Sequence, residues 1–218
     1  MLVMPANNSK WQVHYWQGKY GGLGHLYSVG SFKGPYGHLP YALDNGRFPA
    51  WSSGKPWVEA DYMNLLEQAR KACDSGLWPL WALVPDVVAD KDATLAQWGE
   101  WSEKVRLHLP GVPLAFAAQD GMTPDDVPLD ADVVFMGGSD DFKRPSIRPW
   151  CREFPRVHVG RVNSYSMLVH CYESGAESCD GTGWFRGDQN QLKGLETFLC
   201  QQAHCRFPQQ EDFLHEYL

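Results

Sequence analysis

Four short apolar runs along this chain each lead directly to an acidic or amide residue, and this pattern limits the fold more than any other feature. The polar residues are Asp44 after 41–43, Asp86 after 80–85, Gln119 after 114–118 and Asp180 after 177–179. α/β folds place their chemistry at the carboxyl ends of buried strands. The repetition therefore predicts an enzyme of the α/β class.

Strand-like and helical patterns alternate from residue 79 onward, which is typical of βα units and a parallel sheet. The predicted strands are 79–84, 112–118, 132–136, 156–160 and 177–179, preceded by 41–44 and 1–4. The predicted helices are 59–74, 91–108, 164–173 and 189–203. The spacing favours a compact (β/α) TIM-like barrel over a sandwich.

The number of recognisable strands is smaller than a complete barrel requires. Six or seven strands are recognisable in the sequence, and a full barrel has eight. Either the barrel is trimmed, or a strand lies unrecognised in 26–29. The segments 120–131 and 139–153 are interpreted as loops or short helices. No linker or repeat divides the chain, so we expect a single domain over 1–218.

The composition indicates a globular protein. Apolar residues make up 44% of the 218 residues and charged residues 21%, which argues against disorder and against a membrane protein. The N-terminus lacks a basic segment followed by a long apolar one, so we expect no signal peptide and a cytoplasmic location, the host cytoplasm if the protein is phage-encoded. The six cysteines show no metal-ligand spacing, so we expect free thiols and no metal.

The net charge of −7 argues against a basic surface spread over the whole molecule. A local one stays open, because six basic residues fall between 143 and 161. They are Lys143, Arg144, Arg148, Arg152, Arg156 and Arg161. They predict either one positive edge or an ordinary solvated face.

Parallel strands bring their carboxyl ends to one face, so Asp44, Asp86, Gln119 and Asp180 should converge there together with Gly137 and Gly138. Several carboxylates at one place raise at least one pKa and cost stability, which indicates function. Taken singly, Asp86 could be a helix cap and Asp180 a turn residue.

The order of these motifs resembles the tRNA-guanine transglycosylase superfamily, and most of all its branch that places deazapurines in the DNA of phages and bacteria. The motifs are Leu43-Asp44-Asn45-Gly46-Arg47-Phe48, Val84-Pro85-Asp86, Ala118-Gln119-Asp120-Gly121, Phe135-Met136-Gly137-Gly138, His158-Val159-Gly160-Arg161-Val162 and Cys179-Asp180-Gly181-Thr182. The resemblance spans residues 41–186, and no single motif is specific.

The resemblance implies a role for each strand-end residue. Asp180 would be the nucleophile that attacks the sugar and forms a covalent glycosyl-enzyme, and Asp44 the general acid/base. Asp86, the Gln119 side chain and the Gly138 backbone N–H would bind the edge of a guanine-like base. Gly137, Asn45 and Phe48 complete the predicted substrate-binding set.

Aromatic residues near the strand ends could offer a flat surface for a base drawn out of its stack. The candidates are Tyr41, Phe48, Trp51, Phe135 and Trp184. Most aromatic side chains belong to the core, so we expect only one or two of these to touch a base.

The implied reaction exchanges guanine in DNA for a 7-deazaguanine such as 7-cyano-7-deazaguanine, without cofactor or metal. DNA is favoured over tRNA because this chain has no counterpart of the zinc site of the tRNA-modifying members and is shorter than they are. The sequence leaves open a tRNA-modifying enzyme, a glycoside or nucleoside hydrolase barrel, and a non-catalytic nucleic-acid-binding module.

Overall fold

Eight parallel strands form one sheet in the computed structural model, which describes residues 1–6, 10–186 and 188–204. Their spatial order is β1-β8-β7-β6-β5-β4-β3-β2. The strands are β1 (Leu2–Pro5), β2 (His25–Tyr27), β3 (Tyr41–Leu43), β4 (Ala82–Leu83), β5 (Leu114–Ala118), β6 (Val133–Met136), β7 (Val157–Val159) and β8 (Ser178–Gly181). From β2 to β8, strands that are consecutive in the sequence are neighbours in the sheet, and β1 pairs with β8.

The sheet closes where β1 meets β2. Parallel bridges join Val3 to Leu23 and Ala6 to Leu26. The backbone N–H of Val3 donates to the carbonyl of Gly22 at 2.9 Å, and the N–H of Gly24 donates back to Val3 at 3.0 Å. The predicted TIM-like barrel is confirmed, and it is not trimmed, because all eight strands are present.

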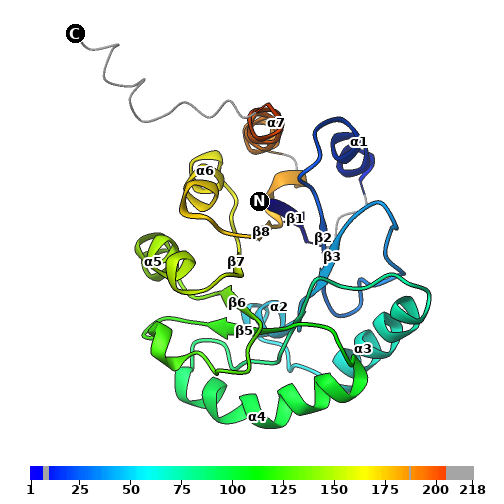
Figure 1. Ribbon diagram of the computed structural model, residues 1–218, viewed down its shortest axis with the longest axis vertical. Helices are drawn as coiled ribbons and strands as arrows, with labels where there is room; N and C mark the ends of the chain where they lie inside the picture. Colours follow the sequence, from blue (N-terminus) through cyan, green and yellow to red (C-terminus); the bar gives the residue numbers. More distant parts are fainter. Residues whose placement is uncertain (7–9, 187, 205–218) are drawn as a thin grey trace.

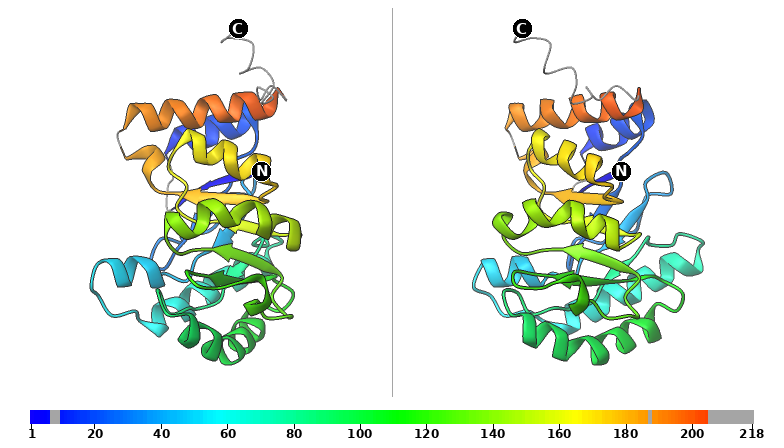
Figure 2. Two further views of the ribbon diagram at one scale, coloured as in Figure 1. Left: turned by 90° about the vertical axis from the view of Figure 1, so that its left-hand side faces the viewer. Right: turned by 60° about the vertical axis from the view of Figure 1, so that its left-hand side comes forward.

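Helices surround the barrel in the described part of the chain (Figure 1). They are α1 (Trp11–Tyr20), α2 (Arg47–Ser52), α3 (Glu59–Asp74), α4 (Lys91–His108), α5 (Asp140–Glu153), α6 (Tyr165–Ser174) and α7 (Gln189–Ala203), with short 3-10 turns η1 (Pro124–Asp126) and η2 (Gly183–Phe185). Figure 2 shows that α2, in cyan, projects from one end of the barrel instead of packing along its side.

The sequence predicted the long helices well and missed three elements. The predicted helices 59–74, 91–108, 164–173 and 189–203 agree with α3, α4, α6 and α7 to within one residue at each end. β2 (His25–Tyr27) overlaps the segment 26–29, which was suspected of hiding a strand, at Leu26 and Tyr27. Helices α1 and α2 were not predicted, and the segment 139–153 is one continuous helix, α5, although it contains Pro145 and Pro149.

Two apolar layers cover the two faces of the sheet, because side chains of a strand alternate between its faces. One layer packs between the strands and the helices and includes Leu43, Phe116 and Val159. The other fills the inside of the barrel and includes Leu26, Ala42, Trp81, Ala115, Ala117 and Val133, with Phe135 against it. The next inward positions, beyond the strand ends, line the site.

Candidate active site at the carboxyl end of the barrel

A cavity of about 720 Å³ opens at the carboxyl ends of the strands. Along each strand every second side chain points inward. The next inward-facing residues after Leu26, Ala42 and Ala117 are Ser28, Asp44 and Gln119, and these line the cavity. Small residues on other strands, Ala6, Gly137 and Gly160, leave the space open. The volume and position are those of a typical small-molecule site in this architecture.

Asp44 lies in this cavity, just beyond β3. One of its oxygens, Oδ1, accepts a hydrogen bond from the N–H of Gly46 at 3.3 Å, and the Ser28 side chain lies close enough to lower the pKa of the carboxyl group. Burial is the largest influence that raises the pKa of Asp44, and the nearby charges of Asp180 and Asp86 raise it as well, while Gly46 and Ser28 lower it; together they bring the pKa to about 6. Asp44 can therefore change its protonation state near neutral pH.

Asp86 is buried and held by two side-chain amides. Asn45 Nδ2 donates to its Oδ1 at 2.9 Å, and Gln119 Nε2 donates to its Oδ2 at 2.9 Å. Burial raises the pKa of Asp86, and the bond from Asn45 and the charge of Arg47 oppose the increase. Asn45, which is 1% exposed, therefore positions Asp86 in this structure.

The Gln119 amide is fully engaged by the protein. Besides Asp86, its Nε2 lies 3.0 Å from the carbonyl of Val87 and 3.0 Å from Oγ1 of Thr94. Its Oε1 accepts from the N–H of Ala89 at 2.6 Å. These contacts tie the loop after β4 to the end of β5, so Gln119 fixes the wall that carries Asp86.

Asp180 is the end of a row of three hydrogen-bonded side chains, which the sequence did not predict. His158 Nε2 lies 3.0 Å from Asp180 Oδ2, and His158 Nδ1 lies 2.8 Å from Ser178 Oγ. The three residues are buried on the inner faces of β7 and β8. A polar residue between Val157 and Val159, at the inward position of a buried strand, was the available signal.

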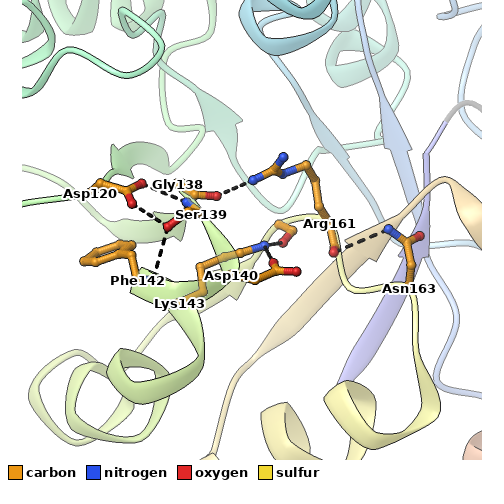
Figure 3. Close-up of polar contacts among 9 residues, drawn as sticks. Asp120, Gly138, Ser139, Asp140, Phe142, Lys143, Arg161 and Asn163 are labelled. Atoms are coloured by element: carbon orange, nitrogen blue, oxygen red, sulfur yellow. Dashed lines mark hydrogen bonds and ion pairs between the residues drawn. The ribbon is translucent and has the colours of Figure 1, made fainter.

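Gly137 and Gly138 line the cavity at the end of β6, as predicted. Gly138 adopts φ +71°, and a Cβ there would collide with Asp120, so both the backbone conformation and the space favour glycine. The carbonyl of Gly138 accepts a hydrogen bond from Nη2 of Arg161 (Figure 3).

Three of the five candidate aromatic residues line the cavity: Phe48, Trp51 and Phe135. Phe48 and Trp51 come from α2, and their ring centroids lie 5.9 Å apart. Trp51 is 57% exposed, so it offers an open apolar surface at the mouth. Tyr41 and Trp184 are instead buried in the layer between the strands and the helices, which agrees with the expectation that most of these aromatic side chains belong to the core.

The six basic residues between 143 and 161 do not form one positive edge. Lys143 is completely buried, and Arg156 pairs with Glu177 at 2.9 Å. Arg161 lines the cavity. Arg144, Arg148 and Arg152 lie on the exposed side of α5. The six basic residues therefore have three different surroundings: the protein interior or an ion pair, the cavity, and the solvent-exposed surface.

Within the described residues, no group of three His, Cys, Asp or Glu side chains is arranged to hold a metal ion. The described cysteines are free, and Cys205 lies outside the described residues. None of the described helices has the length and apolar character that crossing a membrane requires. The cytoplasmic location stays a prediction.

No family model and no curated protein matches this sequence. Among solved structures, it is similar to a 4-hydroxy-2-oxoglutarate aldolase/2-deydro-3-deoxyphosphogluconate aldolase from TTHB1. The two share 12% sequence identity, with a TM-score of 0.49, over 94% of this chain and 93% of the other. No residue role is transferred at this level of similarity.

This comparison corrects the predicted function. The similar structure is an aldolase and not a transglycosylase, which contradicts the predicted exchange of guanine for a 7-deazaguanine. That activity is not pursued, in its DNA or its tRNA form. The hydrolase and binding-module alternatives also receive no support from the comparison.

Proposed function

We propose that the cavity is the active site of an enzyme that works by general acid–base catalysis, with Asp44 as the group that transfers the proton. The observation that carries the proposal is the convergence of Asp44, Asp86 and Asp180 in one cavity, where burial and the neighbouring charges raise the pKa of Asp44 to about 6. A general acid or base works best when its pKa lies near the pH of the reaction, because both protonation states are then populated. Ordinary surface carboxylates lack this property.

Asp180 supplies the second carboxylate of the proposed mechanism. The hydrogen bond from His158 engages Oδ2, so Oδ1 is the atom through which Asp180 would act on substrate. Its charge also helps to raise the pKa of Asp44. Two carboxylates with different surroundings can take different tasks, one exchanging a proton and the other stabilising positive charge that develops on the substrate.

A lysine Schiff base is not part of the proposal. Chemistry of that kind requires a lysine amine that faces the substrate. No lysine is among the described residues that line the cavity. Lys143, which is buried nearby, donates from Nζ to the carbonyl of Gly160 at 2.8 Å and pairs with Asp140 at 3.1 Å. If the reaction is of the lyase kind, the base is a carboxylate.

The first experiment tests the proton-transferring group without knowledge of the substrate. Carbon-13 NMR of the labelled carboxyl groups should show Asp44 titrating near pH 6. In an Asp180→Asn variant the same signal should titrate at lower pH, because one of the charges that raise the pKa is removed. A signal that titrates near pH 4 in the unmodified protein would remove the basis of the proposal.

The second experiment tests catalysis. A library of small polar metabolites is incubated with the protein in D₂O, and mass spectrometry detects conversion or deuterium incorporation. We expect a reaction that Asp44→Asn slows by roughly 100-fold or more and that Asp125→Asn, at an exposed position outside the cavity, leaves unchanged. Equal turnover by Asp44→Asn would contradict the proposed role. DNA and 7-cyano-7-deazaguanine remain predicted partners and are included as ligands.

A further inference from the structure

Two arginines lie on the side of the cavity mouth formed by the last strands. Arg161 follows β7, and Arg186 follows β8 and the η2 turn. Both residues are exposed, and both line the cavity. Asn163 and Thr182 lie on the same two loops and also line it. This rim is therefore positively charged, whereas Asp44, Asp86 and Asp180 line the same cavity with acidic groups.

Two contacts hold the side chain of Arg161 in place. Its Nη2 donates to the Gly138 carbonyl (Figure 3), and its guanidinium lies over the Phe48 ring, 4.4 Å from the centroid. Its backbone adopts φ +58°, a conformation that costs a residue other than glycine about 1–2 kcal/mol. Such a cost is found most often at functional sites. The guanidinium is thus set across the mouth before any ligand binds.

Asn163 connects the two loops that carry the arginines. Its Oδ1 accepts from the N–H of Gly183 at 2.8 Å, and its Nδ2 lies 3.4 Å from the Arg161 carbonyl. A Cβ on Gly183 would lie 2.8 Å from the same Oδ1, so a larger residue would push the loops apart. The relative position of Arg161 and Arg186 is therefore part of the fold.

The charges of both arginines are available to a ligand. Among the described residues, neither guanidinium forms an ion pair with a carboxylate within 4.0 Å. The acids that feel the charge of Arg161 are Asp120 and Asp140. Asp120 accepts hydrogen bonds from Ser139, and Asp140 pairs with Lys143 (Figure 3).

We propose that Arg161 and Arg186, with Asn163 and Thr182, bind a phosphate group of the substrate. Two guanidinium groups match the charge and the several acceptor oxygens of phosphate. The loops after the seventh and eighth strands are also the common phosphate-binding position in barrels of this kind. The acidic residues repel an anion, so the phosphate stays at the rim and an uncharged part of the substrate reaches Asp44.

This inference rests on the proposed function, so its test is made independent of catalysis. Binding of inorganic phosphate is measured by isothermal titration calorimetry on Asp44→Asn protein, in which the proposed proton transfer is absent. We expect Arg161→Gln and Arg186→Gln each to weaken binding by about tenfold. Arg144→Gln, on the exposed side of α5, should bind as the parent does. Thermal unfolding of each variant confirms that it is folded.

Two further ligands identify the source of the phosphate. A nucleoside 5′-monophosphate represents a small substrate, and a short single-stranded DNA represents a polynucleotide backbone. Either one binding more tightly than inorganic phosphate, with the same dependence on Arg161 and Arg186, supports the site and names its source. Absence of saturable phosphate binding, or binding that survives the Arg161→Gln/Arg186→Gln double substitution, overturns the inference. Neither result affects the titration of Asp44.

Discussion

Nε2 of His158 lies 3.0 Å from Oδ2 of Asp180, inside the carboxyl end of the barrel. His158 is itself fixed by its neighbours. The Phe135 ring stacks on it with a centroid distance of 4.8 Å, and the Trp81 ring meets it edge-on at 4.8 Å. Aromatic packing therefore sets the direction of the imidazole, and the imidazole sets the direction of a carboxylate in the cavity.

This contact should be strongly coupled. We expect a double-mutant cycle of His158→Ala and Asp180→Asn to give an interaction energy of about 1–3 kcal/mol, because a buried hydrogen bond to a charged group is worth more than an exposed one. Urea unfolding measures each variant. The more exposed pair of Arg156 and Glu177, each with a side chain that is 29% exposed, serves as the comparison, with about 1 kcal/mol or less expected. Equal coupling in the two cycles would contradict this role of burial.

Asp44 should make the stability of the protein depend on pH in an unusual direction. Its pKa rises from 3.8 to about 6 on folding, so between these values the native state holds the proton more tightly than the unfolded state does. The contribution of Asp44 to the free energy of unfolding is therefore fully present below pH 4 and is lost as the pH rises through 6. The loss amounts to at most about 3 kcal/mol.

The matched variants test this sign. Asp44→Asn removes the cost of burying a charge, so it should be more stable than the unmodified protein at pH 7.5 and close to it at pH 4.5 by urea unfolding. Asp125→Asn, on the surface, should leave the slope of stability against pH unchanged. A slope that survives Asp44→Asn would show that another group causes it.

The fold was predictable where the chain keeps a clear period. Helices α3 and α4 carry apolar residues at helical spacing, so their bounds were found from the sequence. β2 was harder to recognise, because it has only three residues, His25–Tyr27, and lies among glycines and aromatic residues. In α5 the prolines argued against a helix, yet they lie on its exposed side while Ile147 and Trp150 are buried.

The site was predictable in position and not in its contacts. A polar residue directly after a buried strand has to lie at the carboxyl end, which placed Asp44, Asp86, Gln119 and Asp180 together correctly. The partners of these groups come from other strands and loops, and nothing local in the sequence specifies them. Gln119 was expected to meet a ligand, whereas its amide holds Asp86 and the Ala89 backbone.

Ala89 gives a test of the wall that Gln119 holds. Ala89 has φ +62°, which is strained for alanine and free for glycine. We expect Ala89→Gly to be neutral or stabilising by up to about 1 kcal/mol in urea unfolding. Ala96→Gly, at an exposed position inside α4, should instead cost about 1 kcal/mol. Equal losses at both positions would mean that the backbone at Ala89 is not strained.

Lys143 does not line the cavity, but we expect it to stabilise the turn that carries Arg161. Its buried Nζ donates to the carbonyl of Gly160, the residue before Arg161. Lys143→Met keeps the apolar stem and removes the donor, which leaves that carbonyl without this bond at a cost of about 1–3 kcal/mol. Because Arg161 depends on the same turn, we expect phosphate binding to weaken several-fold while Asp44 still titrates near pH 6.

The control is Lys104→Met, since Lys104 pairs at the surface with Glu100 of its own helix, α4, and with Glu59 at the start of α3. Pairs of this kind contribute about 1 kcal/mol or less, and the residue is far in sequence from the turn before Arg161. Calorimetry with inorganic phosphate should therefore distinguish the two lysines. If Lys143→Met lost stability but bound phosphate as tightly as the Lys104→Met protein, the turn before Arg161 would be held by its own backbone, and Lys143 would serve the core alone.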